Sequence, residues 1–337
     1  MTYQILWPKA RWGDDNQIEQ ASLGELALGH FVNEFAEVSD DQWRTCDAIV
    51  SVFDVPQEYQ KKLSNCKIFV TPKVGFDNID VQAWGKRNIP VCNVPDYGTQ
   101  EVADHALALF LSLVKGITFH TRQLKDKPSE NWRPALNPYG MRISNMVFGI
   151  IGMGRIGTAT ALRAKAFGMD VVFFDPYVGN GTELALGVRR VHSLEELAEA
   201  SDAISLHLPH NAETHEMINA KFLDQAKKNL ILINTARGGL IDLNALAEAL
   251  KNDQILAAGL DVLPQEPASR EHPLIQAWSD DEPWIADRLL ITPHSAFYTP
   301  ESLYDMRFKG GEVALNYLEK GRLENCVNQR FLVSQQR

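Results

Sequence analysis

The chain has 337 residues, of which 45% are hydrophobic and 23% are charged, and its formal net charge is −10 at pH 7. This length favours two domains over a single core, and an acidic chain without clustered Lys and Arg is not expected to bind nucleic acid. The longest apolar run, residues 106–114, is about half as long as a membrane span, so we expect no membrane segment.

The four cysteines are scattered through the sequence, with no C-x-x-C pattern and no histidine at ligand spacing. We therefore expect neither a zinc site nor a disulfide framework, and we predict no metal. The N-terminal residues are too polar for a secretory signal. These features favour a soluble protein of the reducing cytoplasm.

Short apolar segments alternate with helix-like segments over the first 98 residues. Strands are predicted at 3–7, 48–53, 67–70 and 91–94, and helices around 16–28, 57–63 and 81–87. Strands and helices that alternate at this spacing are typical of parallel βαβ units. We therefore expect an α/β domain here.

A buried helix and an irregular segment are predicted next. Residues 101–115 are apolar nearly all round, which predicts a buried helix that leads into a second domain. Residues 119–146 are predicted to be irregular. Because a compact protein needs a reason for such a segment, we interpret it as a subunit-interface arm or a loop over the active site.

The stretch 147–175, VFGIIGMGRIGTATALRAKAFGMDVVFFD, contains the pattern of a strand, a glycine loop, a helix and a second strand. Gly152, Gly154 and Gly157 have the spacing G-x-G-x-x-G, which lets a backbone approach a pyrophosphate at a helix N-terminus. Asp175 follows 18 residues later, where a carboxylate accepts hydrogen bonds from the ribose of NAD and repels the 2′-phosphate of NADP. We predict NAD as the cofactor; the alternative is a purely structural glycine turn.

Strand and helix patterns continue after Asp175. Strands are predicted at 203–208, 230–234, 257–262 and 289–292, and helices at 194–200, 220–227 and 243–251. With the two strands at the glycine loop, they predict a six-stranded nucleotide-binding domain. Residues 301–318 are predicted to form one long amphipathic helix that packs on the first domain. The acidic segment 268–288 has no predicted structure or role.

Polar residues follow several strands of the second domain directly. In open parallel sheets, ligands bind beyond the carboxyl ends of the strands. His294 is interpreted as a general acid/base, because histidine titrates near neutral pH, and Glu266 as the carboxylate that orients it. Arg237 is interpreted as the clamp for a substrate carboxylate, and Asp261 as a contact of the nicotinamide carboxamide. Taken singly, each could be an ordinary loop residue.

Five motifs carry a family resemblance: VGFDNID (74–80), GIIGMGRIG (149–157), NTARGGLID (234–242), LDVLPQEP (260–267) and ITPHSA (291–296). Together they resemble the D-isomer-specific 2-hydroxyacid dehydrogenases, over nearly the whole chain and in order. PHSAFY (293–298), the helix 301–318 and ENCVN (324–328) resemble the branch that includes the C-terminal-binding proteins.

The resemblance implies a homodimer formed through the nucleotide domains, with NAD and a small 2-oxo or 2-hydroxy acid in the cleft between two lobes. It adds further predicted contacts: Arg155 and Ile156 over the pyrophosphate, Thr235 and Ala236 near the nicotinamide, His207 at the cofactor, and Val74 and Gly75 at the substrate carboxylate. Lys73 stands where the family usually has glycine, so it is either a second cation for the substrate or a solvated loop lysine.

The predicted fold class is α/β with two domains, each a parallel sheet flanked by helices. A Rossmann-type NAD-binding domain, 99–298, is inserted into a flavodoxin-like substrate domain, 1–98 and 299–337. The predicted function is NAD-dependent interconversion of a 2-oxo acid and a D-(R)-2-hydroxy acid by hydride transfer. Two alternatives stay open: an NADH-sensing interaction module of the corepressor type, and a phosphite-type dehydrogenase on the same scaffold.

Overall fold

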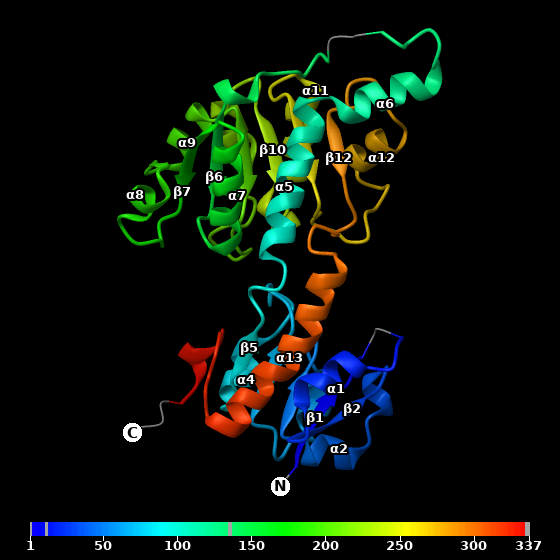
Figure 1. The fold of residues 1–337 in the computed structure, drawn as a ribbon, viewed down its shortest axis with the longest axis vertical. Helices are drawn as coiled ribbons and strands as arrows, with labels where there is room; N and C mark the ends of the chain where they lie inside the picture. Colours follow the sequence, from blue (N-terminus) through cyan, green and yellow to red (C-terminus); the bar gives the residue numbers. More distant parts are fainter. Residues whose placement is uncertain (1, 11–12, 134–136, 334–337) are drawn as a thin grey trace. The chain divides into compact units, whose positions relative to one another are not determined.

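The computed structural model describes residues 2–10, 13–133 and 137–333. The chain forms two compact units. Unit 1 comprises Met1–Gly98 and Tyr298–Arg337, and unit 2 comprises Thr99–Phe297. Both units are parallel sheets flanked by helices (Figure 1), which confirms the predicted fold class.

Unit 1 contains a five-stranded parallel sheet with the order β2-β1-β3-β4-β5, which is the flavodoxin-like order. Its strands are β1 (Tyr3–Trp7), β2 (Ala27–Phe31), β3 (Ala48–Val50), β4 (Ile68–Thr71) and β5 (Val91–Asn93). Its helices are α1 (Gln17–Leu23), α2 (Asp40–Thr45), α3 (Gln57–Gln60), α4 (Val81–Lys86) and α13 (Pro300–Lys320).

The C-terminal helix α13 packs on α1, β3 and β4, which confirms that this helix returns to the first unit. Two adjacent glycines allow the close approach. A Cβ at Gly310 would lie 2.9 Å from the Cβ of Pro72, and a Cβ at Gly311 would lie 1.9 Å from the hydroxyl of Ser22.

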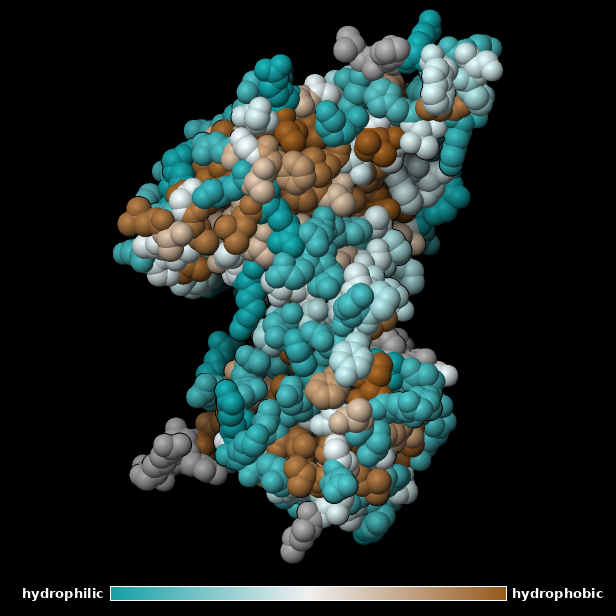
Figure 2. Space-filling view, in the orientation of Figure 1, coloured by the Kyte–Doolittle hydropathy of each residue, from teal (hydrophilic) through white to brown (hydrophobic). Residues whose placement is uncertain are grey.

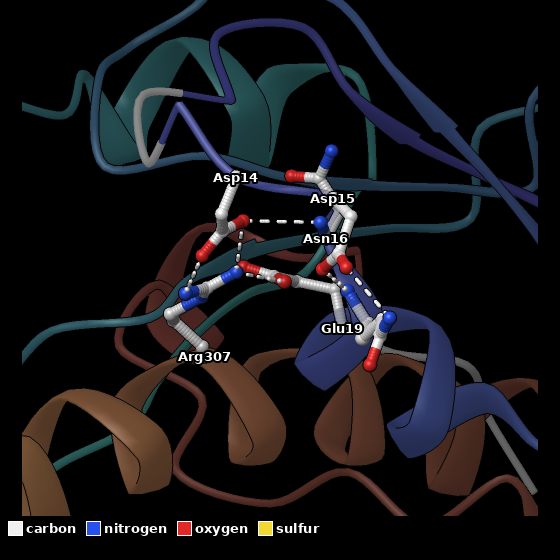
Figure 3. A network of polar contacts seen from close by, with 6 residues as sticks. Asp14, Asp15, Asn16, Glu19 and Arg307 are labelled. Atoms are coloured by element: carbon white, nitrogen blue, oxygen red, sulfur yellow. Dashed lines mark hydrogen bonds and ion pairs between the residues drawn. The ribbon is translucent and has the colours of Figure 1, made fainter.

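A buried ion-pair network joins α13 to the N-terminal part of the chain (Figure 3). The guanidinium of Arg307 donates to the carboxylate of Glu19 at 2.6 and 2.7 Å and to that of Asp14 at 2.6 and 2.9 Å. The Arg307 and Glu19 side chains are 8% and 2% exposed. The hydrogen bonds from Arg307 lower the pKa of Asp14. Arg307 therefore fixes α13 against the start of α1.

Unit 2 contains a seven-stranded parallel sheet with the order β12-β11-β10-β9-β6-β7-β8. Its strands are β6 (Val147–Ile151), β7 (Asp170–Phe174), β8 (Arg189–Arg190), β9 (Ala203–Leu206), β10 (Ile231–Asn234), β11 (Ala257–Leu260) and β12 (Leu289–Ile291). Counted from β6, this is the Rossmann order with a seventh strand added. The strand order reverses between β6 and β9, so a ligand site is expected at their carboxyl ends.

Helices cover both faces of the unit 2 sheet. The helices are α5 (Thr99–Val114), α6 (Ile117–Asp126), α7 (Arg155–Ala166), α8 (Thr182–Leu186), α9 (Leu194–Ala200), α10 (Ala220–Gln225), α11 (Leu243–Lys251) and α12 (Pro273–Ser279). The core against α5 and α7 includes Phe110 and Phe148, whose rings meet edge to face at 5.3 Å. The opposite core is formed against α9 to α12. The predicted buried helix is thus confirmed as α5.

Several elements differ from the sequence-based predictions. The helix predicted around 16–28 ends at Leu23, and the edge strand β2 follows it. The nucleotide-binding unit has seven strands instead of six, because β8 was not predicted. The prediction that the whole segment 119–146 is irregular is wrong, because α6 extends to Asp126. Residues 134–136 of that segment lie outside the described residues.

The acidic segment that had no predicted structure contains α12 and connects to α6. Arg122 of α6 forms ion pairs with Asp281 and Asp287. Arg288 is 6% exposed and donates to the carbonyl oxygens of Ile255 and Leu256. The segment therefore has a structural role in unit 2. Within the described ranges, no single helix has the length and hydropathy of a membrane span; α5 and α6 reach both only as a pair bent by 55°.

Candidate active site

The glycine loop between β6 and α7 has the geometry of a diphosphate site. Gly152 has φ +91°, and a Cβ there would lie 2.4 Å from the carbonyl oxygen of His207. A Cβ at Gly157 would lie 2.0 Å from the carbonyl oxygen of Gly152. At Gly154, which is the N-cap of α7, a Cβ would meet nothing within 4 Å. The space before the helix N-terminus is therefore open, which fits the diphosphate of a dinucleotide.

Asp175 lies beside this loop at the end of β7. Its Oδ2 accepts a hydrogen bond from the backbone N–H of Met153, and its Oδ1 accepts one from that of Tyr177, both at 2.8 Å. Because each carboxylate oxygen can accept a further hydrogen bond, Asp175 remains able to bind ribose hydroxyls. The structure thus brings together Asp175 and the glycine loop, as the sequence predicted for a cofactor site.

His207 follows β9, next to the glycine loop. Its Nε2 is 2.9 Å from the hydroxyl of Ser205. Burial lowers the pKa of His207 to about 3, so its imidazole is neutral at physiological pH. The part of His207 that lies against Gly152 is its backbone carbonyl.

His294 and Glu266 form a pair at the carboxyl ends of β12 and β11. Nδ1 of His294 is 2.7 Å from Oε2 of Glu266, and the other oxygen, Oε1, accepts a hydrogen bond from the N–H of Leu263 at 3.0 Å. The His294 side chain is 43% exposed. Since Glu266 binds Nδ1, Nε2 is the ring nitrogen that a ligand can reach. The arrangement suits proton transfer through Nε2.

A buried carboxylate holds the loop that carries His294. Asp261 is 2% exposed; its Oδ1 accepts hydrogen bonds from the hydroxyl of Thr292 at 2.6 Å and the N–H of Ser295 at 2.9 Å. Its Oδ2 accepts one from the N–H of Ala296, and its carbonyl oxygen accepts one from that of His294. His294 has φ +53°, a strained value for a histidine, so these bonds fix its backbone. The predicted contact of Asp261 with the nicotinamide stays a prediction.

His105 of α5 extends this network and was not predicted as a site residue. Its Nε2 is 2.9 Å from the Thr292 hydroxyl and 3.6 Å from Oδ1 of Asp261. The available signal was a histidine within a helix that the sequence predicts to be buried. His105 thus supports the His294 loop through Thr292.

Arg237 lies in the loop after β10, which packs on the loop that carries Glu266. The Asn234 side chain shapes this loop, accepting from the N–H of Ala236 at 3.0 Å and donating to the carbonyl of Arg237 at 2.9 Å. A Cβ at Gly238 would lie 1.9 Å from the carbonyl carbon of Leu263, so the two loops are in close contact. Arg237 is half-buried and donates to the carbonyl of Ala236 at 2.7 Å.

Thr235 supplies an unsatisfied polar atom in the same loop. Thr235 is 7% exposed, and its buried hydroxyl has no hydrogen-bond partner within the described part of the chain. Buried polar groups are normally paired, so an orphaned hydroxyl at a strand end fits a ligand group. Arg237, Glu266 and His294 thus share one edge of the unit 2 sheet.

The predicted substrate contacts Lys73, Val74 and Gly75 follow β4 in unit 1 and are half-buried. Lys73 Nζ donates to Asn78 at 2.6 Å, and the carbonyl of Val74 accepts from Asn93 at 2.7 Å. Among the described residues, no group of three or more His, Cys, Asp or Glu side chains is arranged to hold a metal.

The part of the chain that holds this candidate site is similar to a known protein family. The profile of the D-isomer specific 2-hydroxyacid dehydrogenase, NAD binding domain, matches residues 107–296. A glyoxylate reductase of Korarchaeum cryptofilum is 35% identical over 294 residues, which are 86% of this chain and 85% of that protein.

Two solved structures have similar folds. The NADPH-dependent glyoxylate/hydroxypyruvate reductase of Sinorhizobium meliloti, with NADP and malonate, has a TM-score of 0.81 and 26% identity, and 97% of each chain is covered. The D-lactate dehydrogenase of Aquifex aeolicus, with NAD and lactic acid, has a TM-score of 0.73 and 29% identity, and 93% of this chain and 95% of that chain are covered.

Proposed function

The chain belongs to the D-isomer-specific 2-hydroxyacid dehydrogenase family, and on this premise we propose that it interconverts a 2-oxo acid and the corresponding D-(R)-2-hydroxy acid. It is a dehydrogenase of the CH–OH group that uses a nicotinamide cofactor. The observation that carries the proposal is the 2.7 Å contact between His294 and Glu266 at the edge of the unit 2 sheet. When bound, NADH supplies the hydride to carbon 2 of the oxo acid.

Proton transfer is assigned to His294. In reduction, Nε2–H of the imidazolium donates its proton to the oxygen on carbon 2; in oxidation, neutral Nε2 removes the hydroxyl proton. Glu266 binds Nδ1–H, so it fixes the ring orientation and stabilises the imidazolium. Asp261 and His105 hold the loop in the conformation that presents Nε2.

Substrate binding is assigned to Arg237, whose planar guanidinium matches a carboxylate and polarises the neighbouring carbonyl. The backbone of Val74 and Gly75 is a further proposed contact, on the strength of the family resemblance. Lys73, which departs from the family pattern, is proposed as a second cation for the carboxylate. Thr235 and Ala236 are proposed to face the nicotinamide, with the unpaired Thr235 hydroxyl as support. Asp261 is proposed there as well, although its carboxylate already serves the His294 loop.

NAD is proposed as the preferred cofactor over NADP. The relative from S. meliloti is NADPH-dependent, whereas that from A. aeolicus was solved with NAD, so family membership leaves the preference open. The support is Asp175, whose carboxylate lies beside the glycine loop and would repel a 2′-phosphate. Arg155, Ile156 and His207 are proposed contacts of the same cofactor.

The experiment is NADH oxidation by the purified protein with glyoxylate, pyruvate, hydroxypyruvate and phenylpyruvate, followed by chiral analysis of the product. We expect turnover with at least one acid and a product of the D-(R) configuration. Tight NADH binding without reduction of any acid would contradict the proposal and would favour an NADH-responsive interaction protein of the C-terminal-binding type. NAD reduction by phosphite, added as a separate reaction, would identify a phosphite-type dehydrogenase instead.

A cytoplasmic homodimer is proposed as the working form. The four cysteines are free, which accords with a reducing compartment. Figure 2 shows hydrophobic residues gathered on one face of unit 2, and the exposed apolar side chains of this unit include Ile117, Leu162 and Phe167. Such a patch is typical of a subunit interface. Light scattering that gives the mass of one chain would contradict the dimer.

A further inference from the structure

Two consecutive arginines, Arg189 and Arg190, form strand β8 beside β7. Cations at this end of a Rossmann sheet are what the 2′-phosphate of NADP would require. The structure gives the two side chains different surroundings, since Arg189 is exposed whereas the Arg190 side chain is 12% exposed. Arg190 therefore needs a separate explanation.

The guanidinium of Arg190 is bound on several sides. Its Cζ lies 4.8 Å from the centroid of the Phe173 ring, a stacking contact. Its N–H groups donate to four oxygens. One is Oε2 of Glu183, at 3.0 Å, and the others are the carbonyl oxygens of Asp175 at 3.2 Å, Val178 at 3.3 Å and Gly179 at 2.8 Å. Four of the five N–H donors of the side chain are thus used within the protein.

These bonds close the segment 175–183 around Arg190. The other oxygen of Glu183 accepts from the N–H of Gly181 at 3.2 Å, and the Thr182 hydroxyl donates to the carbonyl of Gly179 at 2.9 Å. Because its donors are occupied by this segment, Arg190 is poorly placed to bind a phosphate. It instead holds the backbone of Asp175.

We propose that Arg190 is a positioning residue for NAD selectivity, which fixes the segment 175–179 so that the Asp175 carboxylate stays beside the glycine loop. This inference rests on the proposed role of Asp175 in NAD recognition. Without Arg190, the carbonyls of the segment lose their shared donor, and the backbone that places the Asp175 carboxylate beside the glycine loop is held less firmly.

The test is direct cofactor binding to the full chain, measured by NADH and NADPH fluorescence, without turnover. We expect Arg190→Gln to raise the NADH Kd about tenfold and to change the NADPH Kd by less than about twofold. Hydrogen exchange of amides 177–183 should accelerate while the core strands stay protected. Arg189→Ala is the matched control, because it removes an exposed arginine of the same strand, and it should leave both Kd values unchanged.

Asp175→Ala separates failure of this inference from failure of the proposed function. Suppose that Asp175→Ala narrows the difference between the NADH and NADPH Kd values and that Arg190→Gln leaves this difference unchanged. The role of Arg190 is then overturned, while that of Asp175 stands. If neither variant narrows the difference, the proposed NAD recognition fails as well. Should Arg190→Gln not fold, Glu183→Gln removes the ionic partner of Arg190, and an unchanged NADH Kd in that variant would overturn the inference.

A second and independent observation concerns the cysteines. Cys92 of β5 and Cys326 of the C-terminal segment lie opposite each other in an antiparallel β-bridge. Hydrogen bonds flank the bridge, from Val327 N–H to the Val91 carbonyl at 2.8 Å and from Asn93 N–H to the Asn325 carbonyl at 3.2 Å. The cysteines are therefore a non-hydrogen-bonded pair, whose Cα atoms are typically about 4.5 Å apart. That spacing is within the disulfide range of about 4.4–6.8 Å.

The two thiols differ in access and reactivity. Cys92 is fully buried, whereas Cys326 is half-buried. The hydrogen bond between the two thiols lowers the pKa of Cys326 and raises that of Cys92, so Cys326 is the more readily deprotonated thiol of the pair. The Cys326 thiol also lies 3.3 Å from the side-chain oxygen of Asn328.

We propose that Cys92 and Cys326 are an oxidation site that forms a reversible disulfide with a low-molecular-weight disulfide as oxidant. The Cys326 thiolate attacks the oxidant, forms a mixed disulfide and releases one thiolate. The Cys92 thiol then loses its proton and displaces the second thiolate. The pair gives up two electrons and two protons, and the oxidant becomes two thiols. The product ties the C-terminal segment to the edge strand β5.

The test is incubation of the full chain with oxidised glutathione, followed by intact mass and peptide mapping. We expect the loss of two hydrogens, a peptide linked through Cys92 and Cys326, and reversal by dithiothreitol. Cys326→Ser should abolish the link, and the control Cys66→Ser, which alters another unit 1 thiol, should keep it. A stable glutathione adduct at Cys326, a link between other cysteines, or no reaction would each overturn the proposal.

Discussion

At the scale of single residues, His294 combines a strained backbone with an ionic partner for its ring. The strain at φ +53° is sustained by hydrogen bonds to Asp261, and the ring is oriented by Glu266 at 2.7 Å. Strained backbone at a polar residue persists only where the surroundings hold it, and such sites are often functional.

His294→Gln should lower kcat by at least about a hundredfold, because the amide cannot transfer a proton. The Kd for NADH should stay near the wild-type value, since the glutamine retains a similar volume. Steady-state kinetics and NADH fluorescence measure the two quantities. Glu266→Gln, which keeps a hydrogen-bonding group but removes its charge, should show a smaller fall in kcat. An unchanged kcat in His294→Gln would end the assignment of His294 as proton donor.

His207 predicts a pH dependence of stability. Burial depresses its pKa from 6.5 to about 3, so between these values the unfolded chain binds a proton that the folded chain does not. Folding stability contributed by neutral His207 is therefore lost as the pH falls from about 6.5 towards 3. We expect the Tm of the cofactor-free protein to fall between pH 7 and pH 5, and to fall less in His207→Gln. His192→Gln, at an exposed position, should retain the wild-type dependence; equal falls in all three proteins would refute this.

At the scale of elements, the glycine loop between β6 and α7 allows stability and cofactor binding to be separated. A Cβ at Gly154 enters open space, whereas a Cβ at Gly157 meets the carbonyl of Gly152 at 2.0 Å. Gly154→Ala should therefore keep the wild-type Tm but weaken NADH binding, because its methyl group occupies the space of the diphosphate. Gly157→Ala should lower the Tm. Thermal unfolding and fluorescence titration test both, and a Gly154→Ala protein with normal NADH affinity would place the diphosphate elsewhere.

The elements that sequence reasoning predicted are those with a strong local signal. The strands β6, β9, β10 and β11 consist mostly of buried apolar residues, and the glycine spacing marks the loop that follows β6. The strand β8 consists of two arginines, so it carries no apolar pattern; it pairs with Val172 and Phe173 of β7. In β2, an edge strand, Gly29 lies against the ring of Phe31, and Leu28 is 47% exposed.

The site was predictable where residues follow strands, and not where contacts cross the fold. The placement of Arg237, Glu266 and His294 at one edge of the sheet was predictable, because each comes soon after a strand end. The support of Thr292 by His105 joins residues that are 187 positions apart, and the bond of Arg190 to the Asp175 carbonyl depends on a loop conformation. The facing of Cys92 and Cys326 likewise depends on the fold, because the two are far apart in sequence.

At the scale of the whole molecule, the ion-pair network of Arg307 joins the two ends of the chain that build unit 1. Arg307→Gln leaves the buried Glu19 carboxylate without its cation, which should lower the free energy of unfolding by about 3–5 kcal/mol. Urea unfolding measures the change. The double variant Arg307→Met with Glu19→Leu removes both buried charges and should recover most of the loss. If both proteins were equally unstable, packing of α13 rather than charge would be the cause.

The division of unit 1 into two chain segments has a consequence for synthesis. During translation, β1 to β5 leave the ribosome first, then all of unit 2, and α13 after it. Unit 2 is continuous in sequence, so it can fold without α13. The ion pair of Glu19 cannot form until Arg307, 288 residues later, has been synthesised. Until then, the face of β3 and β4 that α13 covers is open to solvent. Termination near residue 297 would thus yield a chain with a complete unit 2 and a unit 1 sheet that lacks α13. We expect chaperones to bind the apolar surface exposed on that sheet.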